Sequence, residues 1–162
     1  MIEPERFKSP AYLRVLDDQI SELSAFIGKS VEQVMRKAAE SGYPNEACGL
    51  LVGRLDDQGW HVDAAYEVRN INEDRSADRF LLDPEGYQRV DQSVRGTGQE
   101  IIGVFHSHPD CPAKPSPTDL GHAWESFLYP IVSVDRGVVH EIAYWTLNAN
   151  GDRFQSVSVR ML

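Results

Sequence analysis

A run of apolar and β-branched residues that ends in two closely spaced histidines constrains this chain more than any other feature. Residues 100–106 read Glu-Ile-Ile-Gly-Val-Phe-His, which is typical of a buried strand, and Ser107 and His108 follow directly. Side chains at positions i and i+2 of a strand point to the same face. We therefore expect His106 and His108 to converge on one point beside a sheet, as two metal-ligating imidazoles must.

A proline-rich loop leads from this strand to a helix start that carries a carboxylate. Residues 116–119 read Ser-Pro-Thr-Asp, with serine at the N-cap, proline at the first helical position and an acid at the third. Capping alone would account for Ser116 and Asp119, and two histidines at this spacing can also occur without a metal. Together with the histidines, however, Asp119 would give a zinc ion three protein ligands and leave a fourth position open for water.

The motif formed by these four residues resembles the signature of the JAMM (MPN+) metallopeptidase family: His106-x-His108, seven residues, then Ser116-x-x-Asp119. That family also has a glutamate just before an upstream apolar strand, and Glu46 precedes the matching run Ala-Cys-Gly-Leu-Leu-Val-Gly. The resemblance covers about residues 30–147. It implies a cytidine-deaminase-like MPN fold of the α/β (α+β) class, a single domain whose mixed, largely antiparallel sheet is flanked by helices.

The resemblance also implies a role for each residue of the motif. His106, His108 and Asp119 would bind one Zn²⁺ ion per chain. Glu46 would be the general base that takes a proton from the water and later gives it to the leaving nitrogen. Ser116 would donate a hydrogen bond to the oxyanion or position the water. Considered singly, Glu46 could be a solvated glutamate at a helix–strand junction, and Ser116 only a cap.

A substrate follows from the same resemblance. JAMM proteins cut isopeptide or peptide bonds after the C-terminal glycine of ubiquitin-like β-grasp proteins. The short chain and its variant loop at residues 106–113 resemble the bacterial branch that acts on sulfur carrier proteins, releasing cysteine or another addition that follows Gly-Gly. Three alternatives stay open: a non-catalytic binding module of the same fold, a zinc hydrolase of another small amide, and a member linked to DNA repair.

Composition limits the partners. The net charge of −9 argues against nucleic acid, because binding to phosphate needs a basic surface. No apolar run is long enough to span a membrane and the N-terminus lacks a signal-peptide pattern, so we expect a cytoplasmic protein with no membrane partner. A length of 162 residues fits one domain with a single core.

Both cysteines lie near the motif in the sequence. Cys48 is two residues after Glu46, and Cys111 is in the loop after His108. They do not form a Cys-x-x-Cys pair, and we expect one packed thiol and one loop thiol in a reducing compartment. The alternative is that Cys111 reaches the zinc ion or is oxidised.

The remaining patterns predict helices and strands around the motif. We expect helices over 30–42 (Ser30 as N-cap), 84–95 and 117–127, and strands over 49–55, 60–69, 79–83, 129–135, 140–147 and 153–159. Trp124, Phe127 and Trp145 are expected in the core. The other histidines, His61, His122 and His140, are expected to be ordinary strand or helix residues, although His122 could support the site from three residues beyond Asp119.

We expect residues 1–28 to form an N-terminal extension and residues 29–162 to form a metallopeptidase domain. Apolar residues at positions 12, 13, 16, 20, 23, 26 and 27 approximate a helical stripe. Such a helix could pack on the domain or form the contact of a homodimer. The alternative is a loosely held extension.

Overall fold

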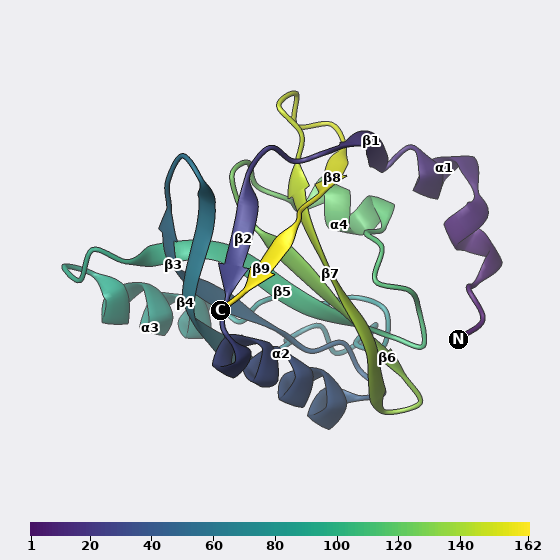
Figure 1. The fold of residues 1–162 in the computed structure, drawn as a ribbon. Helices are drawn as coiled ribbons and strands as arrows, with labels where there is room; N and C mark the ends of the chain where they lie inside the picture. Colours follow the sequence, from purple (N-terminus) through teal and green to yellow (C-terminus); the bar gives the residue numbers. More distant parts are fainter.

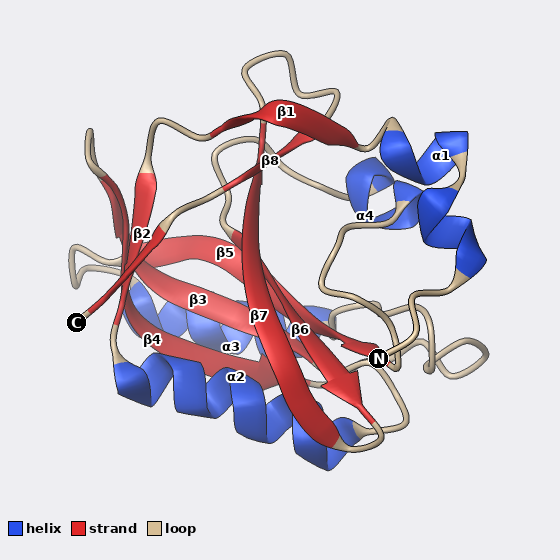
Figure 2. Cartoon of the chain, turned by 45° about the vertical axis from the view of Figure 1, so that its right-hand side comes forward, coloured by secondary structure: helices blue, strands red, loops and turns tan.

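The computed structural model, which describes residues 1–162, is built on a curled nine-stranded sheet with the strand order β1-β8-β7-β6-β5-β3-β4-β2-β9 (Figures 1 and 2). The strands are β1 (Leu16–Ile20), β2 (Ser24–Ile27), β3 (Cys48–Leu55), β4 (Gly59–Val68), β5 (Glu100–Pro109), β6 (Tyr129–Asp135), β7 (Val138–Leu147), β8 (Phe154–Ser156) and β9 (Val159–Met161). Antiparallel pairing joins the longest strands, β3 with β4 and β5, and β6 with β7. The predicted mixed, largely antiparallel sheet is therefore confirmed.

Two long helices pack on opposite faces of the sheet, which gives the molecule two apolar clusters. Helix α2 (Lys29–Gly42) buries Met35 in the larger cluster, and α3 (Pro84–Val94) buries Val94 in the smaller one. Neighbouring residues of the central strands alternate between the clusters, because successive side chains of a strand point to opposite faces. In β5, Val104 thus faces the α3 side and Phe105 the α2 side.

The predicted helix in the N-terminal region is wrong beyond its first turn. The chain forms a 3-10 turn (Glu5–Lys8) and the short helix α1 (Pro10–Leu13), and then continues as β1 and β2. β1 pairs in parallel with β8, while β2 lies between β4 and β9. The apolar residues that approximate a helical stripe are instead used by strands whose partners come mainly from the C-terminal end of the chain.

Several local boundaries also differ from the prediction. Helix α2 begins at Lys29 with Gly28 at the N-cap, so Ser30 is not the cap. The segment 79–83 is no strand and contributes only an isolated bridge between Asn70 and Leu82. Helix α4 (Pro117–Gly121) ends well before residue 127.

The early end of α4 changes the surroundings of the aromatic residues that follow it. Trp124 is 56% exposed, so its prediction as a core residue is wrong. Its backbone N–H donates to the hydroxyl of Tyr129, which anchors the turn after the helix. Phe127 and Trp145 are half-buried against the smaller apolar cluster.

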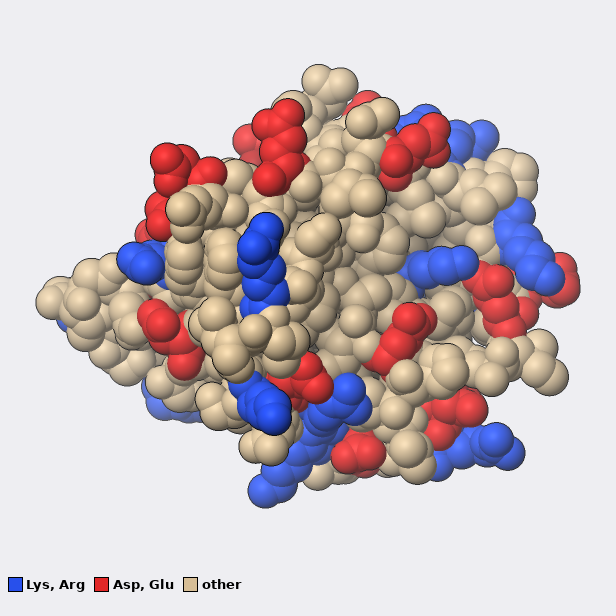
Figure 3. Space-filling model, in the orientation of Figure 1, with Lys and Arg blue, Asp and Glu red and all other residues tan.

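Charges of both signs are mixed over the surface. On the face shown in Figure 3, lysine and arginine side chains are interspersed with acidic ones, as expected of a chain with 16 basic and 25 acidic residues. No helix has both the length and the apolar character needed to cross a membrane.

Candidate metal centre and active site

Strand β5 brings the two histidines of the motif together. His106 and His108 lie on the face shared with Val104, and their Nε2 atoms are 3.1 Å apart. Ser107 points to the opposite face, where its hydroxyl accepts a hydrogen bond from the backbone N–H of Ala47 at 2.8 Å. The convergence predicted from the i, i+2 spacing is therefore present.

Helix α4 supplies the carboxylate. Asp119 is the third helical residue and forms a capping box with Ser116. The Oδ2 atom of Asp119 accepts a hydrogen bond from the backbone N–H of Ser116 (2.8 Å), and the Ser116 hydroxyl accepts one from the backbone N–H of Asp119 (3.1 Å). The same carboxylate lies 3.3 Å from the Nε2 atoms of both His106 and His108. Asp119 is thus at once a cap and a member of the cluster, which we call the ligand cluster.

The ligand cluster has dimensions that suit zinc. Its three candidate ligand atoms all lie within 4.8 Å of one another, and the closest approaches are 3.1 to 3.3 Å. Four ligands about 2.0–2.1 Å from a tetrahedral zinc ion lie about 3.3–3.4 Å from each other. Two imidazoles and one carboxylate also form a donor set that leaves the fourth position open. The residues present therefore fit the metal that the sequence motif implies.

Each histidine ring is held by a contact that the sequence analysis did not identify. The Nδ1 atom of His108 lies 2.9 Å from the carbonyl oxygen of Pro112, so an Nδ1–H that donates there leaves Nε2 free to bind metal. The ring of His106 stacks on Phe80 with centroids 4.6 Å apart. In the sequence, only the proline-rich loop after His108 could have indicated the Pro112 contact. Nothing local in the sequence places Phe80 against strand β5.

Glu46 is held in place by its backbone at the junction before β3. Its N–H donates to the carbonyl of Ser76 (2.6 Å), and its own carbonyl accepts from the side-chain amide of Asn70 (3.0 Å). The residue is only 6% exposed. Burial raises the pKa of its carboxyl to about 7, although the nearby His106 and His108 act in the opposite direction. A general base operates best with a pKa near the working pH.

The charges of the ligand cluster support one another. Burial works against ionisation of Asp119, but the two histidines outweigh it and hold the pKa of that carboxyl well below its usual range. Burial also lowers the pKa of His108, yet the Asp119 carboxylate more than compensates and raises it above the ordinary value. Without metal, the cluster therefore favours a protonated imidazole against a carboxylate.

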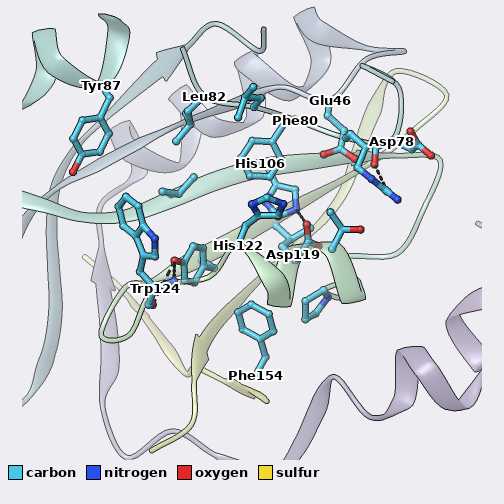
Figure 4. A pocket seen from close by; sticks show the side chains of 17 residues that line it. Glu46, Asp78, Phe80, Leu82, Tyr87, His106, Asp119, His122, Trp124 and Phe154 are labelled. Carbon is cyan, nitrogen blue, oxygen red and sulfur yellow. Dashed lines mark hydrogen bonds and ion pairs between the residues drawn. The ribbon is translucent and has the colours of Figure 1, made fainter. Parts of the chain in front are cut away.

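Two cavities meet at Glu46, Asp78 and Arg79, which line both of them. The first, which we call the apolar cavity, measures about 300 Å³ and extends from His106 and Asp119 along a wall of apolar side chains (Figure 4). That wall includes Phe80, Leu82, Tyr87, Trp124 and Phe154, and His122 also lines the cavity. The second, which we call the cationic cavity, measures about 290 Å³ and lies beside His108 and Ser116. Its other lining residues include Arg6, Phe7, Tyr12, Arg75 and Arg79. The ligand cluster therefore borders both cavities.

The two thiols lie outside the ligand cluster. Cys48 is buried, donates to the carbonyl of Val68 at 3.4 Å, and has its pKa raised by burial to about 12. Cys111 is half-buried in the cationic cavity, where its sulfur accepts from the Arg6 guanidinium at 3.1 Å. Burial raises the pKa of this thiol as well, against the opposing effect of Arg6.

A buried two-histidine, one-carboxylate cluster beside a buried glutamate, carried by a mixed α/β sheet, is the arrangement expected of a metal-dependent hydrolase. The profile of the family described as prokaryotic homologs of the JAB domain matches residues 28–148. The chain belongs to this family, which confirms the JAMM/MPN resemblance of the sequence.

Two named relatives and one solved structure are similar to more than half of the chain. A protein from Haloferax volcanii named desampylase is 36% identical over 140 residues, which are 85% of this chain and 93% of that protein. A protein from Thermus thermophilus named probable TtuB-protein conjugate cleaving protease is 28% identical over 92 residues, 57% of this chain and 58% of that protein. A solution structure of a protein from Desulfitobacterium hafniense superposes with a TM-score of 0.73 at 28% identity, covering 85% of this chain and 92% of that one.

Proposed function

We propose that this protein is a zinc-dependent peptidase or isopeptidase that hydrolyses the amide bond after the C-terminal Gly-Gly of a ubiquitin-like β-grasp sulfur carrier protein. The observation that carries the proposal is the juxtaposition of the ligand cluster with Glu46, the buried glutamate at the junction of both cavities. The names of the relatives from Haloferax and Thermus support cleavage of protein conjugates. Release of cysteine from a carrier is one form of the reaction.

In this mechanism the metal and the protein have separate tasks. Zinc held by His106, His108 and Asp119 would supply Lewis acidity, which polarises a carbonyl and lowers the pKa of water. Glu46, with its pKa near 7, accepts a proton from the attacking water and then donates it to the leaving nitrogen. The Ser116 hydroxyl accepts the Asp119 N–H, so its own hydrogen is free to stabilise the oxyanion. Apolar side chains line the site on the side of the apolar cavity.

Mass spectrometry can test the proposal directly. Zinc-loaded protein is mixed with a β-grasp sulfur carrier extended by one residue beyond Gly-Gly, and the Glu46→Gln variant is assayed beside it. We expect the wild type alone to remove the extension, because glutamine keeps the size of Glu46 but cannot accept a proton. The variant should still bind zinc, since Glu46 is outside the ligand cluster.

The outcomes separate the competing functions. A variant that cleaves at the wild-type rate would contradict the role of Glu46 as general base. A protein that binds no zinc would favour a non-catalytic module of the same fold. A zinc-loaded protein that leaves every extended carrier and every conjugate intact would instead point to a different amide substrate.

A further inference from the structure

The cationic cavity concentrates positive charge beside the ligand cluster of an acidic protein. Three guanidinium groups, those of Arg6, Arg75 and Arg79, line it, although the whole chain has a net charge of −9. They come from two separate segments, the N-terminal turn and the loop between β4 and α3. The acidic residues of the same cavity are Asp78 and the largely buried Glu46.

Two of these three cations have no carboxylate partner. Arg75 forms a two-point ion pair with Asp78. The guanidinium of Arg79 donates only to the backbone carbonyl of Asp78 at 3.1 Å. That of Arg6 contacts the Cys111 sulfur at 3.1 Å and lies 5.3 Å from the centre of the Phe7 ring. The cavity therefore has three guanidinium groups against two carboxyl groups, and only Arg75 forms a direct ion pair.

We propose that the cationic cavity binds the α-carboxylate of a substrate's C-terminal residue through Arg6 and Arg79, a contact that a short C-terminal extension can make. This inference rests on the proposed peptidase function and narrows its substrate class. Arginine binds carboxylates through paired, charge-assisted hydrogen bonds. A lysine joined to a carrier by an isopeptide bond lies within a protein chain and presents no such terminal carboxylate.

The size and walls of the cavity favour a chain end. Its volume of about 290 Å³ is at the lower end of small-molecule sites, which suits one or two residues. One wall is the N-terminal segment, whose Phe7 is 6% exposed and whose Glu3 forms an ion pair with Lys114 at 3.0 Å. A folded protein attached at this side would have to displace that segment, whereas a short extension would not.

Glu46 lies where both cavities meet, so it is placed to transfer the proton during cleavage of such a substrate. The carrier tail would approach through the apolar cavity and its extension would lie in the cationic cavity, so the scissile bond is at their junction. Water adds its oxygen to the glycine carbonyl carbon and the C–N bond breaks. A proton from that water passes by way of Glu46 to the nitrogen, which leaves as the free amine of the extension.

Calorimetric titration of the zinc-loaded Glu46→Gln variant tests the site without cleavage. The probe is a synthetic peptide ending in Gly-Gly-Ala, with either a free carboxylate or a carboxamide. We expect the carboxylate form to bind about tenfold more tightly. Adding Arg79→Gln or Arg6→Gln should each reduce the ratio to below about threefold. Adding Arg54→Gln, at an exposed arginine of β3 outside both cavities, should leave the ratio unchanged.

Two results would overturn the inference: equal affinity for the two peptides, or no binding of either. Loss of the preference with Arg54→Gln would do the same. The proposed peptidase function is judged separately, by cleavage with the wild-type enzyme. If the wild type cleaves carboxylate and carboxamide substrates equally well, the peptidase assignment stands and the carboxylate site fails. If it cleaves neither while the binding preference is observed, the carboxylate site stands and the peptidase assignment fails.

Discussion

The Asp119 side chain has two roles: it caps helix α4 and it belongs to the ligand cluster. Its Oδ2 accepts the N–H of Ser116 and so caps α4, while the same carboxylate lies 3.3 Å from both histidine Nε2 atoms. A cap needs only an oxygen acceptor, which asparagine also has, whereas a zinc ligand here benefits from a full negative charge. Substitution at this one residue can therefore distinguish the helix cap from the metal site.

We expect Asp119→Asn and Asp119→Ala both to lose zinc, by at least about tenfold in affinity, because the anionic ligand is gone. Only the alanine variant should also lose the cap, at a cost of about 1 kcal/mol in the free energy of unfolding of the metal-free protein. Zinc content measured by mass spectrometry and urea unfolding provide the two measurements. An alanine variant with unchanged zinc content would reduce Asp119 to a cap.

Among the strands, β3 depends on close contact at Gly49, three residues after Glu46. A Cβ atom there would lie 2.3 Å from the carbonyl oxygen of Tyr66 and 2.4 Å from the Phe105 ring. Both neighbours are fixed, since Tyr66 is held in the pairing of β3 with β4 and Phe105 is fully buried. The glycine of the upstream motif thus allows the strand that follows Glu46 to pack against β4 and β5.

Gly49→Ala should lower the free energy of unfolding by about 3 kcal/mol, near the top of the range for overpacked cores. Gly121→Ala is the matched control, because no atom outside its own stretch of helix lies within 4 Å of its Cβ position, and its effect should stay below about 1 kcal/mol. Urea unfolding of both variants makes the comparison. Equal stability of the two variants would show that β3 can shift to make room for the methyl group.

The elements that the sequence predicted well are those whose signals are local. The apolar run of β5, the capped start of α4 and the proline at the start of α3 are each encoded within a few residues. β1 and β2 were missed because pairing with other segments overrode a weak helical pattern: β8 and β9 lie more than 100 positions away, and β2 also pairs with β4. In the site, motif spacing identified the residues of the ligand cluster. Phe80 and Arg79, which lie in a loop, and Arg6, which lies in the N-terminal 3-10 turn, come near it along paths that no periodicity encodes.

At the scale of the whole molecule, we expect the ligand cluster to couple folding to both metal and pH. In the metal-free protein the raised pKa of His108 and the depressed pKa of Asp119 describe a charged pair. The histidine contribution to stability is fully present below about pH 6.5, the unfolded value, and is lost as pH rises through the higher folded pKa. The aspartate contribution remains until pH falls through its low folded pKa.

The stabilisation added by zinc should increase with pH, opposite to that of the histidine, because zinc binds only neutral imidazoles and must displace their protons. We expect zinc to raise the melting temperature strongly near pH 8, where fewer protons compete for the imidazoles. At about pH 5.5, protons compete for the ligands and the increase should nearly vanish. Thermal unfolding with zinc and with a chelator, at both pH values, measures the difference.

His108→Ala is the control and should show no zinc-dependent shift at either pH. A shift of equal size at pH 5.5 and pH 8 would mean that zinc binds away from the histidines, and the ligand cluster would then lose its place in the proposed mechanism.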